Sequence, residues 1–262
     1  MLGLLLAFTV RAPRRQPTSA AEAGESFLQT MASLARTPSY ALIVVAGSSG
    51  AIAAYAVGTW APSFLIRSHG LSLTEAGALL GIGGGLMSVI GTLTCGWFTD
   101  RMVRRDSGWQ LGAALLGTAM SIPFGLLFFL WPAGSALQLG SLAVPTAFAL
   151  YLGFAFFGTW WSVPCFGAMT HLFPASRLAQ GTAMFLMGVT LLGVGLGPLV
   201  VGVLSDVFEL AIGAEALRYA MAATMVILLL PCFALARAIP QYRRQVDGHD
   251  VDLPIESLPE GA

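Results

Sequence analysis

Lysine is absent from this sequence, and charged residues of any kind make up only 10% of its 262 residues. The thirteen arginines are balanced by thirteen acidic residues, so the formal net charge is zero, and a nucleic-acid partner, which requires a basic surface, is not expected. Apolar residues reach 56% and the mean hydropathy is +0.78, whereas about a quarter of the residues in soluble domains are charged. The composition therefore predicts an integral membrane protein.

Cysteine is scarce as well. Cys95, Cys165 and Cys232 each fall in an apolar stretch, and no two of them have the C-x-x-C spacing of a zinc or redox site. This pattern indicates neither a disulfide framework nor a metal centre, and we expect no metal and no cofactor. We interpret the three thiols as small packing residues.

Six apolar runs are long enough to cross a hydrocarbon core of about 30 Å as helices. They carry no charged residue except Arg218, at the edge of the last run. An outer-membrane barrel would instead need alternating segments of about ten residues. The sequence therefore predicts an all-α integral membrane protein whose bundle, residues 40–236, holds transmembrane helices at about 40–66, 76–98, 111–131, 142–169, 179–204 and 217–236.

Arginine is distributed unequally between the two sides of the predicted bundle. Eleven of the thirteen precede the first run, follow the last, or lie in the loops at 99–110 and 171–178, and only Arg67 and Arg218 lie on the other side. Loops rich in arginine remain in the cytoplasm. We therefore expect a multi-pass protein of the inner membrane with both termini in the cytoplasm.

The segments that flank the bundle have compositions of their own. Residues 1–10 are apolar but too short to span, and we interpret them as the end of a truncated transmembrane helix. Residues 11–39 are predicted to be a cytoplasmic linker that contains an interfacial amphipathic helix, since apolar residues recur at helical spacing over 26–36. Residues 237–262 are predicted to be a disordered cytoplasmic tail.

The most specific motif lies between the second and third runs, where Gly96, Asp100, Arg101, Arg104 and Arg105 form G-x-x-x-D-R-x-x-R-R. It resembles the signature loop of the Major Facilitator Superfamily, although Val103 stands where the family usually has glycine. The resemblance implies a conformational latch that is released as a transporter changes face. The alternative for the arginines alone is ordinary positive-inside charge.

Three further segments resemble bacterial spinster-like members of that family. Ala54 to Leu65 is similar to their seventh helix, Gly193 to Asp206 to their eleventh, and Ala216 to Ala220 to the start of their twelfth. The resemblance implies that the chain is the C-terminal six-helix half of a secondary transporter, that an N-terminal six-helix half is its partner, and that a small organic or lipid-like substrate crosses by alternating access. The alternative is a truncated or remnant half without activity of its own.

Glycines recur at four-residue spacing in two of the runs, at Gly77, Gly81 and Gly85 and again at Gly193 and Gly197. This spacing is typical of helices that pack closely in membranes. In the resembled family such packing and hinging belongs to the gating helices, which here implies a role for Gly193, Gly197, Pro198 and Gly202. The alternative is the generally high glycine content of membrane helices.

Candidate substrate-cavity residues are polar or aromatic and lie at plausible depth within the predicted helices. The stronger candidates are Tyr55, Thr59, Trp60, Thr92, Trp160, Trp161 and Met187, with Thr94, Ser162, Met184 and Thr190 beside them. Packing or an interfacial aromatic belt is the alternative for each. No carboxylate or histidine lies within a run, so any group that couples transport to protons is expected in the other half.

An enzymatic alternative arises from Gly47 to Gly50, which matches the G-x-S-G nucleophile motif of rhomboid intramembrane proteases. Such a protease needs a histidine at membrane depth to activate Ser49. The candidates His69 and His171 both lie at helix ends. We therefore predict that the chain is not an enzyme.

Overall fold

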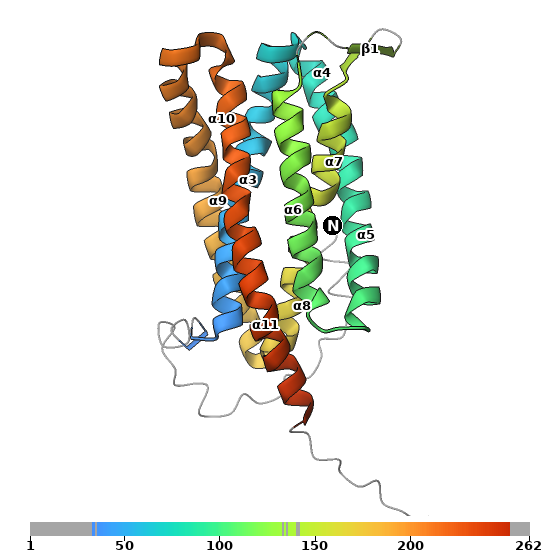
Figure 1. Cartoon of the computed structure of the whole chain (residues 1–262), viewed down its shortest axis with the longest axis vertical. Coiled ribbons are helices and arrows are strands. Elements are labelled where there is room, and N and C mark those ends of the chain that lie inside the picture. The colour runs from blue at the N-terminus through green and yellow to red at the C-terminus, as the bar shows by residue number, and fades with distance from the viewer. Residues whose placement is uncertain (1–32, 35, 133, 135, 140–141, 252–262) are drawn as a thin grey trace, which may run out of the picture.

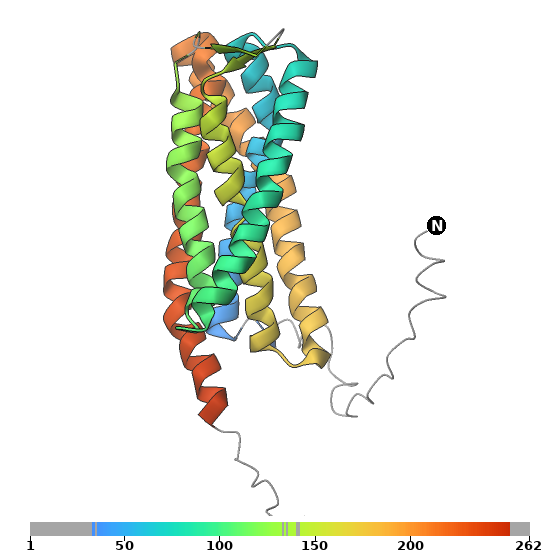
Figure 2. The ribbon, with the colours of Figure 1, turned by 90° about the vertical axis from the view of Figure 1, so that its right-hand side faces the viewer.

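The computed structural model describes residues 33–251 except for 35, 133, 135, 140 and 141 (Figure 1). Within these limits the chain forms an elongated helical bundle with a small hairpin at one end (Figures 1 and 2). The predicted helix end at 1–10 and most of the linker at 11–39 lie outside the described residues. The elements that position the site are α3 (Pro38–His69), α4 (Leu73–Ala78), a π-helix η2 (Leu79–Gly84), α5 (Gly85–Val103), α6 (Trp109–Leu130), β1 (Ala136–Leu139), β2 (Leu142–Pro145), α7 (Phe148–Gly158), α8 (Ser162–Leu172), α9 (Ala175–Ile212), η3 (Gly213–Glu215), α10 (Ala216–Thr224), η4 (Met225–Leu228) and α11 (Leu229–Val251).

Five stretches of the described chain are helical, long and apolar enough to cross a membrane. The last of them, Arg177–Gly248, holds 72 residues, more than three times the length needed for a core of about 30 Å. It folds back at Gly213, whose φ of 59° suits glycine, so that α9 and the α10–α11 rod run in opposite directions (Figure 1). The all-α membrane fold expected from the sequence is therefore confirmed.

The run predicted as one helix at 142–169 is divided in the structure. Its first residues form β2, which pairs antiparallel with β1, and helix resumes only at Phe148. A second break separates α7 from α8, because Pro164 has no N–H to donate to the carbonyl of Trp160. The thiol of Cys95 donates to that carbonyl instead, at 3.4 Å.

The tail predicted to be disordered over 237–262 is helical as far as Val251, so the prediction is wrong for residues 237–251. The reason is packing against the bundle, since Ala238 is fully buried and Tyr242 is only 1% exposed. Arg243 adds an ion pair with Asp106 in the α5–α6 loop. Residues 252–262 lie outside the described part of the chain.

Apolar side chains fill the bundle in two clusters, one toward each end. Phe64 packs edge-on against Phe128 and Phe129, with ring centroids 5.2 Å apart in both pairs, in the cluster near β1 and β2. Tyr40 anchors the other cluster and donates to the carbonyl of Gly181 at 2.7 Å. The two ends of α3 are thus fixed by separate cores.

The end of α6 is capped from a distance by Arg218. Its Nε donates to the carbonyl of Phe129 at 2.8 Å, and its Nη2 donates to the carbonyls of Leu130 and Trp131 at 2.6 and 2.7 Å. These carbonyls belong to the last turn, which has no intrahelical donors. A cation at a helix C-terminus is also favoured by the helix dipole.

Candidate functional site

Helices α3 and α9 pack along a seam of small residues. A Cβ built at Gly197 would lie 2.7 Å from the carbonyl oxygen of Ile52 and 3.0 Å from the nitrogen of Ala56. At Gly193 it would lie 2.6 Å from the ring of Tyr55. These glycines are therefore required for the close approach of the two helix backbones.

Trp60 and Pro198 join the same two helices by a hydrogen bond. The indole Nε1 of Trp60 donates to the carbonyl oxygen of Pro198 at 3.0 Å. Pro198 removes one backbone hydrogen bond from the interior of α9, which makes this point of the helix easier to bend. A Cβ built at Gly202, one turn further on, would lie 3.7 Å from the ring of Trp60. The indole thus sits directly against the proline of α9.

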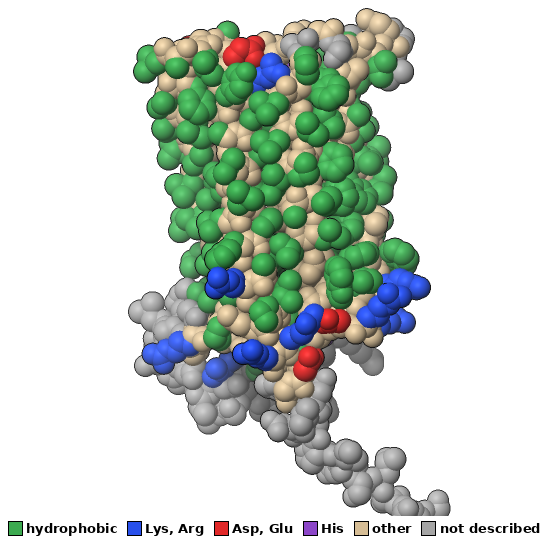
Figure 3. All heavy atoms as spheres, viewed as in Figure 1, with side chains coloured by type: hydrophobic (Ala, Val, Ile, Leu, Met, Phe, Trp, Pro, Cys, Tyr) green, Lys and Arg blue, Asp and Glu red, His purple; other side chains and the backbone are tan. Residues whose placement is uncertain are grey.

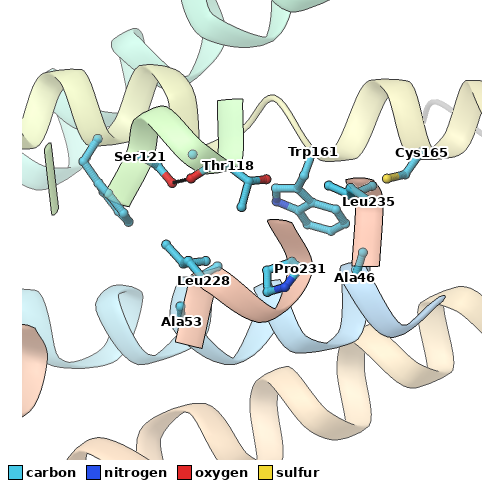
Figure 4. Close-up of a pocket in the computed structure, with 14 residues that line it drawn as sticks. Ala46, Ala53, Thr118, Ser121, Trp161, Cys165, Leu228, Pro231 and Leu235 are labelled. Atoms are coloured by element: carbon cyan, nitrogen blue, oxygen red, sulfur yellow. Dashed lines mark hydrogen bonds between the residues drawn. The ribbon is translucent and has the colours of Figure 1, made fainter. Parts of the chain in front are cut away.

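A small cavity lies between α3, α6, α8 and α11, and Trp161 reaches into it (Figure 4). Ala46 and Pro231 lie on one side of it, across from Thr118 and Ser121. The hydroxyls of Thr118 and Ser121 donate to carbonyls of their own helix, at 2.8 Å each. The free space is about 30 Å³, room for roughly two waters. A lipid-like solute cannot fit inside this cavity.

The other candidate residues do not converge on the cavity. Trp160 is only 4% exposed and packs against Gly117 of α6. Thr92 and Thr94 donate to carbonyls one turn earlier in α5, at 2.8 and 2.7 Å, and Ser162 donates to the carbonyl of Thr159. The three hydroxyls are thus satisfied within the bundle, whereas the buried Nε1 of Trp160 has no hydrogen-bond partner among the described residues.

Tyr55, Thr59 and Met187 lie on the outer surface around the α3–α9 seam. Tyr55 is 41% exposed and Met187 is 49% exposed. Thr59 is exposed as well, and so is Thr190, one turn before Gly193 on α9. Ala54, which lines the edge of the Trp161 cavity, is exposed beside Tyr55. Met184 instead packs against the cluster around Tyr40.

The residues of the signature motif lie at the arginine-rich end of the bundle (Figure 3). Asp100, Arg101, Arg104 and Arg105 are exposed. Among the described residues, none of these four side chains makes a hydrogen bond or an ion pair. A Cβ at Gly96 would meet nothing within 4 Å. Any partner of this motif therefore lies outside the described part of the chain.

Asp106 and Arg243 form a charged contact that the sequence did not single out. The Nε of Arg243 donates to Oδ1 of Asp106 at 2.7 Å, Nη2 contacts Oδ2, and the N–H of Gly108 donates to Oδ1 at 2.8 Å. The contact closes the α5–α6 loop onto α11. No spacing rule links residues so far apart in sequence, so only the fold reveals the pair.

Ser49, the serine of the protease-like motif, is engaged within α3 and lies far from the histidine of that helix. Its hydroxyl donates to the carbonyls of Val45 at 2.6 Å and Ala46 at 3.3 Å, so its hydrogen bonds lie within its own helix. His69 ends the same helix, about 30 Å away at 1.5 Å per residue. A general base must reach its nucleophile by a hydrogen bond.

The sequence has relatives among membrane transporters. An MFS-type efflux pump from Mycolicibacterium smegmatis (strain ATCC 700084 / mc(2)155) is 35% identical over 218 residues, which is 81% of this chain and 47% of the pump. The chain thus spans about half the length of this curated relative. The relatives are transporters and not enzymes, which confirms the prediction that the chain is not an enzyme.

The fold is similar to that of a bacterial homologue of the human lysosomal transporter spinster. Its inward-facing, unoccupied structure matches with a TM-score of 0.73 at 21% identity, over 94% of this chain and 57% of that one. The inward-facing, occupied structure matches with a TM-score of 0.67 at 20% identity, over 94% and 56%. The expected spinster-like fold is therefore confirmed. The family profile described as Major Facilitator Superfamily matches residues 1–166, and the chain is accordingly a multi-pass membrane protein that belongs to this superfamily.

Proposed function

We propose that this chain acts as the C-terminal six-helix half of a secondary transporter that moves a small organic or lipid-like solute by alternating access. Its arginine-rich end faces the cytoplasm from the inner membrane, and both termini lie on that side. The observation that carries this proposal is the pair of exposed hydroxyls near the middle of α3.

Tyr55 and Thr59 lie near the midpoint of the 32-residue α3, at a depth where lipid tails offer no hydrogen bonds. Both side chains are exposed, and within the described chain neither hydroxyl has a hydrogen-bond partner. Polar side chains at this depth normally face a bundle interior or a water-filled cavity. This face of the chain is therefore suited to line a cavity rather than to contact lipid.

The opposite side of the bundle has the character expected of a lipid-facing surface. On α6, η4 and α11 as far as Phe233, the large exposed side chains are all apolar, namely Met120, Leu127, Leu130, Val226, Leu229, Leu230 and Phe233. Figure 3 shows this apolar band between the charged ends of the molecule. The contrast between the two sides supports a cavity on the α3 side.

The presence of a second six-helix unit is supported by glycines whose outer side contacts nothing in the described chain. A Cβ built at Gly77, Gly81 or Gly85 meets nothing within 4 Å, and the same holds for Gly96 in the signature motif. Small residues permit close approach of another helix. In the proposed transporter the N-terminal half packs against α4 and α5, while Asp100 and Arg101, with Arg104 and Arg105, latch the two halves.

The α3–α9 seam supplies the moving part in this proposal. Gly193, Gly197 and Gly202 allow α9 to slide and bend against α3, and Pro198 weakens α9 where Trp60 holds it. Bending at this point would move Met187 and Thr190 relative to Tyr55. The apolar and uncharged lining suits an amphiphile such as a lysolipid, and membrane lipids surround the remaining faces.

Cysteine accessibility tests the proposed cavity. The variants Tyr55→Cys and Thr59→Cys are expected to react with a membrane-impermeant maleimide in native membranes at least ten times faster than the matched lipid-facing variant Leu230→Cys. The wild-type chain, in which Cys95 and Cys165 are buried and Cys232 is half-buried, provides the background rate. Equal rates for the α3 and α11 variants would contradict a water-filled cavity on the α3 side.

An efflux assay separates a half-transporter from a self-sufficient one. Cells that express the chain alone are expected to retain ethidium as fully as cells with an empty vector, because alternating access requires two halves that rock about a shared site. Efflux by the chain alone that is abolished by Thr59→Trp would overturn the assignment as a dependent half.

A further inference from the structure

A long apolar groove runs between α6 and α11 on the side away from Tyr55 and Thr59. It encloses about 440 Å³, and among the described residues Arg243 is the only charged one that lines it. Gly108 and Gly112 add no side chain of their own to its wall, and a Cβ built at Gly108 would lie 2.6 Å from Nε of Arg243. The complete lining consists of Gly108, Trp109, Gly112, Leu115, Leu116, Ala119, Ile239 and Arg243.

The length of this groove matches one leaflet of a bilayer. From Gly108 to Ala119 the helix rises about 16 Å at 1.5 Å per residue. Half of a hydrocarbon core of about 30 Å is about 15 Å. The groove begins at the arginine-rich end of the bundle, so its charged end lies at headgroup level and its apolar end near the midplane. Trp109 lies at the interfacial depth that indole rings prefer.

A second, polar hollow continues from the charged end of the groove. It encloses about 490 Å³, is lined by Val103, Arg104, Arg105, Asp106, Ser107, Arg243 and Asp247, and shares Arg243 with the groove. Its three arginines outnumber its two aspartates. Ser107 Oγ is a buried atom without a hydrogen-bond partner among the described residues. The hollow thus offers excess positive charge beside the apolar groove.

We propose that the groove and the hollow together bind one anionic phospholipid, with an acyl chain along α6 and α11 and the phosphate against Arg243. Asp106 engages Nε and Nη2 of Arg243, which leaves Nη1 to donate to a phosphate oxygen. Arg104 and Arg105 line the same hollow and add to its positive field. Charge complementarity at one end and a leaflet-length apolar groove at the other select a lipid over a soluble anion.

Native mass spectrometry of the full-length chain, released from nanodiscs of mixed phosphatidylglycerol and phosphatidylcholine, tests this proposal. We expect one retained phosphatidylglycerol, with at least a fivefold preference over phosphatidylcholine. Ala119→Leu, which fills the groove, and Arg243→Gln, which removes the phosphate ligand, should each lower retention at least fivefold. Arg237→Gln is the matched control, because Arg237 lies on α11 over the ring of Phe233 and outside the groove.

Asp106→Asn distinguishes lipid binding from simple stabilisation of α11. It breaks the same ion pair as Arg243→Gln but frees Arg243, so retention of phosphatidylglycerol should stay equal or rise. Equal loss in both variants would show that the ion pair, not a phosphate contact, controls retention. Equal retention of the two lipids, with no effect of Ala119→Leu, would identify only adventitious annular lipid. A co-purified apolar peptide of several kilodaltons would identify a partner helix as the occupant instead.

Discussion

Arg243 donates from Nε to Oδ1 of Asp106 at 2.7 Å, across 137 residues of sequence. The contact joins the loop between α5 and α6 to the part of α11 that lies beyond the apolar bundle. Because the N–H of Gly108 donates to the same carboxylate, the loop and the helix share one anchor. The C-terminal part of α11 is therefore held by a charge pair in addition to the buried rings of Tyr40 and Tyr242.

Breaking this pair is expected to loosen α11 locally without unfolding the bundle. Both side chains are partly exposed, and surface ion pairs contribute about 0–1 kcal/mol. In Asp106→Asn, amide hydrogen exchange should accelerate severalfold over residues 240–251 while the melting temperature changes little. Arg237→Gln is the control on the same helix. Unchanged exchange in Asp106→Asn would mean that the other contacts of α11, which include the Ser39–Gln245 hydrogen bond, hold this segment.

Gly197→Ala should separate α3 from α9. The added methyl group would lie 2.7 Å from a backbone oxygen of α3, which cannot move aside as a side chain can. Overpacking of this kind costs about 1–3 kcal/mol. Thermal melting in detergent should show a lower midpoint. Gly195→Ala is the matched control on α9, since a Cβ there meets nothing within 4 Å, and its midpoint should match the wild type.

Trp60→Phe keeps an aromatic ring against Gly202 but removes the donor to Pro198. The carbonyl oxygen of Pro198 then loses its side-chain partner, and a hydrogen bond of this kind contributes about 0.5–1.5 kcal/mol. We expect a correspondingly lower melting temperature. Trp97→Phe, at an exposed indole on α5, should leave the temperature unchanged. Equal effects of the two substitutions would count against a specific role for the Trp60 hydrogen bond.

Arg218→Gln should lower the melting temperature more than Arg67→Gln, which replaces the other arginine near this end of the bundle. The Arg218 side chain is only 15% exposed and donates to three carbonyls of the α6 terminus. Hydrogen bonds from charged groups contribute about 1.5–3 kcal/mol. Melting should shift several degrees below the wild type. Arg67→Gln, at an exposed arginine of α3, should leave the melting temperature unchanged, and comparable shifts would exclude the capping role.

Much of the fold follows from the sequence because long uncharged runs have few alternatives in a bilayer. Hydropathy does not locate the break at Thr159, which depends on Pro164 and on a thiol from α5. It also misassigned residues 237–251, where polar residues alternate with buried ones. Tyr242 and Ala238 have a partner surface only once the bundle is assembled, so a local pattern cannot reveal their burial.

The candidate site was predicted less completely than the fold. Residue type and depth identified Tyr55, Thr59 and Trp161, but they could not separate a buried Trp160 from a cavity-lining Trp161, since adjacent helical residues point in different directions. The roles of the glycines and of the signature motif remain predictions. The pairing of Asp106 with Arg243 could not be predicted, because it depends on the approach of the α5–α6 loop to α11 in the folded chain.

Arg218 also imposes an order on the biosynthesis of this end of the bundle. It follows Trp131 by 87 residues, so α6 is synthesised well before its cap. At about 5–20 residues per second, several seconds separate the two on the ribosome. During that interval the carbonyls of Phe129 and Leu130 depend on water or on the membrane-insertion machinery. Final closure of this end of the protein thus waits for α10.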